Sequence, residues 1–93
     1  MIKIVDNDIW RGSSKIGWLE NNRVFDEDGI KVGHYQGNDI FDTDGIKVGY
    51  IMNNRLESND GKSFPLDDIR NKIAGSSAPD IIRAAVFLLI GDE

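Results

Sequence analysis

The chain has 93 residues, a formal net charge of −5 and no cysteine. This length predicts a single domain (residues 1–93) with a limited core. The acidic balance argues against nucleic-acid binding and an anionic membrane surface, because no basic patch is present to contact phosphates. Without cysteine, disulfides and thiol chemistry are excluded. The N-terminus lacks the apolar stretch of a signal peptide, so we expect a cytoplasmic protein.

Residues 1–13 form a degenerate first copy of a repeat that dominates the chain. Asn7-Asp8-Ile9-Trp10 follows the pattern of Asn38-Asp39-Ile40-Phe41, and residues 2–5 would be the first strand. The connection Arg11-Gly12-Ser13 is shorter than its later equivalents. Terminal copies of repeat arrays are usually atypical because they cap the array.

Residues 14–61 are three tandem copies of a 16-residue unit, namely SKIGWLENNRVFDEDG, IKVGHYQGNDIFDTDG and IKVGYIMNNRLESNDG. Each copy predicts a β-hairpin, because Asn-Asn or Gly-Asn at its centre suits a two-residue turn with positive φ. Counting outward from that turn places Tyr35 opposite Ile40 and His34 opposite Phe41. The closing Asp-x-Asp-Gly predicts a bulged turn into the next copy. The strands should therefore pair as an antiparallel meander of four hairpins.

Side-chain alternation divides the hairpins into two faces. The face expected to be the core carries most of the aromatic residues: Ile16, Trp18, Phe25, Ile30, Val32, His34, Phe41, Ile46, Val48 and Tyr50. The other face is polar near the Asp-Gly turns. Near the Asn turns it carries an apolar patch made of Leu19, Val24, Tyr35, Ile40, Ile51 and Leu56. A patch of this size needs a cover.

Residues 62–93 change to helical periodicity. We expect one helix from about Pro65 to Ala74, a linker with Ser76 and Ser77 as capping residues, and a second helix over residues 79–90. The second helix spans about 18 Å, too short to cross a bilayer. It is apolar almost all round, whereas the patch can cover one side only. The other side should pack on a second subunit in a homo-oligomer, most simply a two-fold dimer, through Val86, Phe87, Leu88, Leu89 and Ile90.

The repeat resembles the four-fold β-flower domains of small bacterial proteins. The resemblance covers Ile2 to about Ile90 and is carried by the aspartate-glycine turns, by Gly17, Gly33 and Gly49, and by Ala84-Ala85-Val86-Phe87-Leu88-Leu89. It implies a pseudo-four-fold flower of hairpins and no catalytic residues. The short first turn and Glu57-Ser58, which replaces an aromatic-Asp pair, depart from this pattern.

The residues that invite a chemical role have simpler explanations. Asp26-Glu27-Asp28-Gly29 lacks the flanking oxygen ligands of a calcium loop, so we interpret it as a turn and expect no metal or cofactor. His34 is the single histidine and is expected to pack on the core face. Lys15, Lys31 and Lys47 are expected to face Asp28, Asp44 and Asp60 in weak solvated pairs.

No nucleophile–base pair or phosphate loop stands out, so we do not expect an enzyme. The sequence favours a non-catalytic structural or protein-interaction module with a protein partner. The first alternative is a small-ligand domain in which Trp10, Trp18, Tyr35 and Tyr50 line a central depression. A second alternative is a hydrolase that acts through unpaired aspartates.

Overall fold

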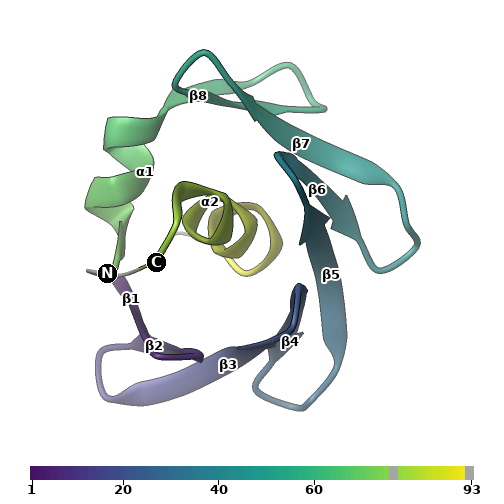
Figure 1. Ribbon diagram of the computed structural model, residues 1–93. Helices are drawn as coiled ribbons and strands as arrows, with labels where there is room; N and C mark the ends of the chain where they lie inside the picture. Colours follow the sequence, from purple (N-terminus) through teal and green to yellow (C-terminus); the bar gives the residue numbers. More distant parts are fainter. Residues whose placement is uncertain (76–77, 92–93) are drawn as a thin grey trace.

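The strands of the chain join in one ten-stranded sheet in the computed structural model, which describes residues 1–75 and 78–91 (Figure 1). The strands are β1 (Ile2–Val5), β2 (Asp8–Arg11), β3 (Ser14–Glu20), β4 (Arg23–Asp26), β5 (Lys31–Gln36), β6 (Asp39–Asp42), β7 (Lys47–Met52), β8 (Arg55–Ser58), β9 (Ser63–Pro65) and β10 (Ile73–Ala74). Strands β1 to β9 form the predicted antiparallel meander, and β10 pairs in parallel with β1. Two helices, α1 (Leu66–Lys72) and α2 (Asp80–Leu89), complete a mainly β fold, as expected.

The predicted hairpin turns are confirmed. In the middle hairpin, Gln36 pairs with Asp39, Tyr35 with Ile40 and His34 with Phe41, so Gly37 and Asn38 form the two-residue turn. The φ of Gly37 is +60°, which lies in the left-handed region that such a turn requires.

The Asp-Gly turns carry the predicted bulges. The register shifts between Ile40 and Phe41, so that Val48 is the extra residue on the neighbouring strand. The turn itself is held by its first aspartate: Asp42 Oδ1 accepts hydrogen bonds from the backbone N–H groups of Asp44 and Ile46, each at 2.9 Å. The same two bonds occur at Asp26. These aspartates therefore act as turn residues.

The assignment of the two sheet faces was wrong. The face that turns inward is the one with the apolar patch, where Val24, Ile40 and Leu56 are each 0% exposed. The aromatic face turns outward, and Ile30 and Ile46 at its turns are 61% and 57% exposed. The extra residues of the bulges, Ile16, Val32 and Val48, do pack with the core as expected. A bulge breaks the strict alternation of a strand, which explains why these three depart from the rest of the aromatic face.

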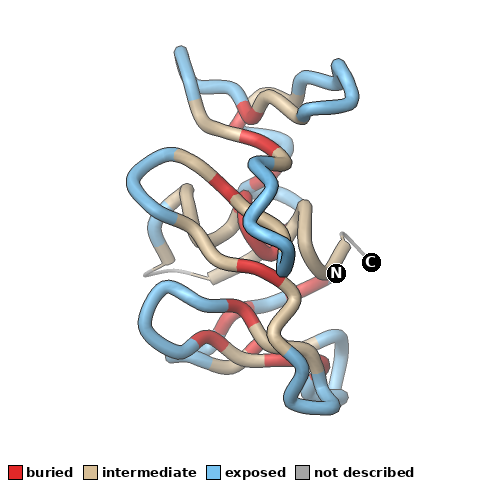
Figure 2. Tube along the Cα trace, turned by 90° about the vertical axis from the view of Figure 1, so that its right-hand side faces the viewer, coloured by how far each residue is buried: buried red, intermediate tan, exposed pale blue. Residues whose placement is uncertain are grey.

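Helix α2 fills the space that the sheet encloses. In Figure 1 it lies inside a ring formed by the strands and α1. Ala84, Ala85 and Val86 are each 0% exposed and belong to a core shared with the inward-facing strand residues. Figure 2 shows the buried positions gathered within the strands and the exposed ones at the hairpin ends. The apolar patch thus has its cover within the chain.

Three inward-facing glycines let α2 come close to the sheet. A Cβ atom at Gly33 would lie 2.7 Å from Leu89 Cδ1, and one at Gly49 would lie 2.5 Å from Leu88 Cδ1. At Gly17 the corresponding neighbour is Ile90 Cδ1, at 3.4 Å. The glycine that recurs in each copy therefore marks a contact with the helix.

The C-terminal segment differs in part from the expectation. Helix α1 ends at Lys72 and not at Ala74, because Ile73 and Ala74 form β10 beside β1. Ile73 is 0% exposed, and its strand pairing outweighs the helical spacing of the sequence. Helix α2 matches the predicted position, while the proposed capping residues Ser76 and Ser77 lie outside the described residues. Neither α1 nor α2 has both the length and the apolar character needed to cross a membrane.

Candidate functional site

The aromatic residues suggested as a ligand site do not meet in a central depression. Helix α2 occupies the centre, and Trp10, Trp18 and Tyr50 lie on the outer face of the sheet. Tyr35 faces inward and packs against the core, where burial raises the pKa of its hydroxyl. The geometry that would have formed the predicted ligand site is therefore absent from the described part of the chain.

The outer aromatic residues form stacked pairs across the hairpins. The ring centroids of Trp18 and Phe25 are 5.5 Å apart, and those of His34 and Phe41 are 4.8 Å apart. We call Trp18, Phe25, His34, Phe41 and Tyr50 the outer band. Each of these side chains is partly exposed. His34 thus packs against a neighbouring ring, as expected, but outside the sheet.

The lysines of the repeat do not bind the predicted aspartates. Lys15 Nζ lies 3.0 Å from Asp8 Oδ1, and Lys47 Nζ lies 3.0 Å from Asp39 Oδ1. The same amino groups lie over outer aromatic rings, Lys15 at 5.4 Å from the centroid of Trp18 and Lys47 at 4.7 Å from that of Tyr50. The bulge carries Lys15 and Lys47 toward the preceding hairpin, so their partners come from that hairpin and not from their own.

Among residues 1–75 and 78–91, no group of three or more His, Cys, Asp or Glu side chains is arranged so that it could hold a metal ion. In the third turn, a hydrogen bond with Ser58 lowers the pKa of the Asp60 carboxyl. Ser58 occupies the position that Asp26 and Asp42 hold in the earlier turns.

The residues predicted for an oligomer interface contact the core of their own chain. Val86 is 0% exposed, and Phe87 packs edge-on against Phe64 with ring centroids 5.0 Å apart. Leu88, Leu89 and Ile90 approach the glycines of the sheet and are partly exposed. In Figure 1 the strands and α1 surround the helix, so more than one of its sides has neighbours within the chain. The oligomeric state itself stays a prediction.

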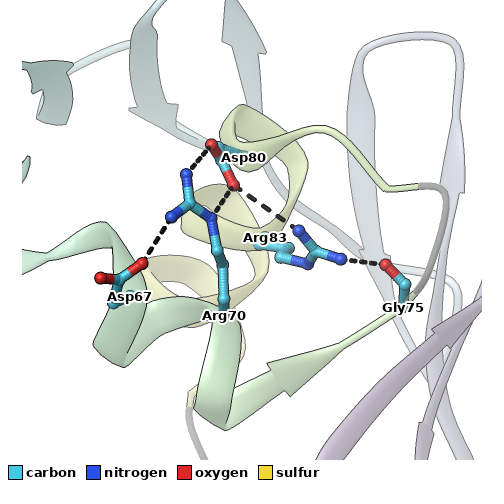
Figure 3. Close-up of polar contacts among 5 residues, drawn as sticks. All are labelled: Asp67, Arg70, Gly75, Asp80 and Arg83. Atoms are coloured by element: carbon cyan, nitrogen blue, oxygen red, sulfur yellow. Dashed lines mark hydrogen bonds and ion pairs between the residues drawn. The ribbon is translucent and has the colours of Figure 1, made fainter. Parts of the chain in front are cut away.

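A charged cluster that the sequence analysis missed joins the two helices (Figure 3). Arg70 of α1 donates to both carboxylate oxygens of Asp80 at the start of α2, at 3.0 and 2.7 Å, and to Asp67 at 2.7 Å. These bonds hold the pKa of the Asp80 carboxyl below its usual range. Arg83 adds an ion pair to Asp80 and a hydrogen bond to the carbonyl of Gly75. No sequence signal links residues 67 and 70 to residue 80, because the contact depends on how the helices pack. We interpret the cluster as a clamp between α1 and α2.

A hollow of 640 Å³ opens where β1, β10 and the start of α2 meet, and its lining includes Ile4, Leu19, Pro79 and Ile82. Its charged lining residues are Lys3 and Asp6, and none of the four aromatic residues proposed for a ligand site lines it. The hollow therefore combines apolar side chains with the polar side chains of Lys3, Asp6 and Asn7.

Comparison with family models, with curated proteins and with solved structures finds no match for this chain. The resemblance to β-flower domains accordingly stays a prediction.

Proposed function

We propose that the protein is a non-catalytic protein-interaction module that binds its partner through the outer band. The observation that carries this proposal is the division of apolar residues between the two faces of the sheet. The apolar residues of the inner face pack against α2, whereas the stacked rings on the outer face remain partly exposed. Aromatic residues are enriched at protein interfaces because one rigid side chain contributes a large contact area.

The proposal is tested by capturing partners from the native cell with three immobilised proteins: the unaltered chain, Trp18→Ala and Met52→Ala. Met52 is 56% exposed next to a hairpin turn and lies outside the outer band, so it serves as the matched control. A protein retained by the unaltered chain and by Met52→Ala, but lost by Trp18→Ala, supports the proposal. Equal retention by all three proteins would contradict it.

The rival function is a small-ligand domain that uses the repeat aromatics. A thermal-shift screen against a metabolite library separates the two, because a ligand raises the melting temperature by mass action. A reproducible shift that is lost in Trp18→Ala would favour the rival. A hydrolase would instead show an activity that is abolished by replacing one carboxylate.

The homo-oligomer, the four-fold symmetry, the bacterial origin and the cytoplasmic location remain parts of this proposal. Light scattering at micromolar concentration measures the oligomeric state. Val86 is buried within the chain, whereas Phe87, Leu88, Leu89 and Ile90 remain partly exposed. A dimer through these four residues stays a prediction, and the outer band is the second surface that we propose for it.

A further inference from the structure

The outer face repeats one arrangement of four residues wherever two hairpins meet. At the β6–β7 junction, Asp39 pairs with Tyr50 and Phe41 pairs with Lys47. We call the four residues of two such pairs a quartet. The diagonal of this quartet is an ion pair, with Lys47 Nζ 3.0 Å from Asp39 Oδ1. The β2–β3 quartet has the same diagonal, formed by Lys15 and Asp8 at 3.0 Å.

The β4–β5 quartet breaks this pattern. Arg23 pairs with His34 and Phe25 pairs with Lys31, so Arg23 stands where the neighbouring quartets have an aspartate. Its diagonal therefore joins two cations. Within residues 1–75 and 78–91, neither side chain forms an ion pair, and Arg23 is exposed.

The β8–β9 quartet also has an arginine in place of the aspartate, but there the arginine has a hydrogen-bond partner. Arg55 replaces the aspartate there too, but the lysine is replaced by Ser63, whose hydroxyl accepts a hydrogen bond from Arg55 Nε at 2.7 Å. That quartet also contains its own acid, Glu57. Of the four quartets, the β4–β5 one alone combines two cations with no acidic residue.

The surroundings of Arg23 and Lys31 combine apolar neighbours with one acid, Glu20, which pairs with Arg23 across the β3–β4 hairpin. Within the described residues Glu20 forms no ion pair with Arg23, so the guanidinium can bind an acidic ligand. The quartet lies between the two stacked pairs of the outer band, because Phe25 is stacked on Trp18 and His34 on Phe41. Asp26 lies next along β4, but its Oδ1 already accepts the backbone N–H groups of Asp28 and Ile30. A guanidinium binds a carboxylate with two parallel hydrogen bonds, which adds geometric specificity to the charge.

We propose that the β4–β5 quartet binds a carboxylate from an acidic segment of a partner protein. This inference rests on the proposed function, since it names the partner's chemistry at the same outer band. The bound carboxylate takes the place that Asp8 and Asp39 occupy in the neighbouring quartets, and this equivalence favours a carboxylate over a phosphate. The chain as a whole carries a net charge of −5, but its long-range repulsion is screened beyond about 8 Å at physiological salt.

The test is a titration of the full chain, followed by the NMR shifts of its backbone amides at about 0.15 M salt. The probe is an acetylated and amidated hexaglutamate peptide, and hexaglutamine is the uncharged control. We expect hexaglutamate to shift the amides of Arg23, Lys31 and His34. Arg23→Asp should weaken this binding at least tenfold, because it gives the quartet the internal ion pair of its neighbours. Asp39→Arg should create a second binding quartet at β6–β7.

Several results would overturn the inference. These are equal binding by Arg23→Asp, shifts away from the quartet, no binding of hexaglutamate, or binding of inorganic phosphate without hexaglutamate. If Arg23→Asp loses its dispersed spectrum, Arg23→Gln provides the same comparison by removing the charge alone.

The inference can fail while the proposed function stands. A partner that is lost by Trp18→Ala but retained by Arg23→Asp would keep the outer band as the interface and reject the anion site. If hexaglutamate binds at the quartet but no partner depends on Trp18, the anion site stands and the outer band is rejected as the protein interface.

Discussion

Replacing Gly33 by alanine should severely destabilise the fold. A Cβ atom there would lie 2.3 Å from the backbone oxygen of Phe41 and 2.7 Å from Leu89 Cδ1, and both distances are too short for contact. The leucine could change rotamer, but the Phe41 oxygen belongs to the paired strand and can move only if the hairpin moves. Overpacking typically costs about 1–3 kcal/mol, and a backbone clash places this variant at about 3 kcal/mol or more. A domain of this size has a total stability of roughly 5–15 kcal/mol.

Urea denaturation measures this change as a loss of unfolding free energy. Gly37→Asn is the matched control in the same hairpin, because a Cβ there meets nothing within 4 Å. Asn21 and Asn53 hold the equivalent position in the other copies, at φ of 58° and 54°, so the control should stay within about 0.5 kcal/mol of the unaltered chain. A Gly33→Ala protein as stable as this control would refute the clash with the backbone of the paired strand.

Three further predictions concern the sheet faces, the turns and the helix clamp. Ile40→Ala should cost about 2–5 kcal/mol and Phe41→Ala clearly less, since Ile40 is 0% exposed while its neighbour lies on the outer face; equal costs in urea would contradict the face assignment. Asp42→Ala should lower the melting temperature, with a cost of about 1 kcal/mol, because two backbone N–H groups lose their acceptor. Asp80 has its pKa lowered by Arg70 in the folded chain, so its stabilisation is complete above the unfolded value of about 3.9 and disappears as the pH falls through the folded pKa. Asp80→Asn should therefore cost under about 1 kcal/mol at pH 7 and flatten the acid-induced loss of stability, measured as unfolding free energy between about pH 5 and pH 2; an unchanged pH profile would argue against the clamp.

Several features of the fold could be predicted because they depend on neighbouring residues. A two-residue turn at Gly37-Asn38 sets the register of its hairpin, since each pair further out follows by counting. Asp42 binds backbone groups two and four residues ahead, so its turn is also encoded locally. Less of the candidate site could be predicted from the sequence. Its aromatic residues were evident in the repeat, but their exposure and the pairing of Lys47 with Asp39 depend on how the hairpins join.

The sequence by itself determined the hairpins, their turns and bulges, the mainly β class, and which residues share a face away from the bulges. The tertiary structure decided which face is inside. Alternation with a period of two residues separates the faces but does not rank them, and here both faces carry apolar side chains. The choice depends on α2, which can come close to the sheet only where Gly33 and Gly49 leave room for Leu89 and Leu88. The helix packs on the face that carries these glycines, and the rings of the outer band remain on the opposite face, where they are partly exposed.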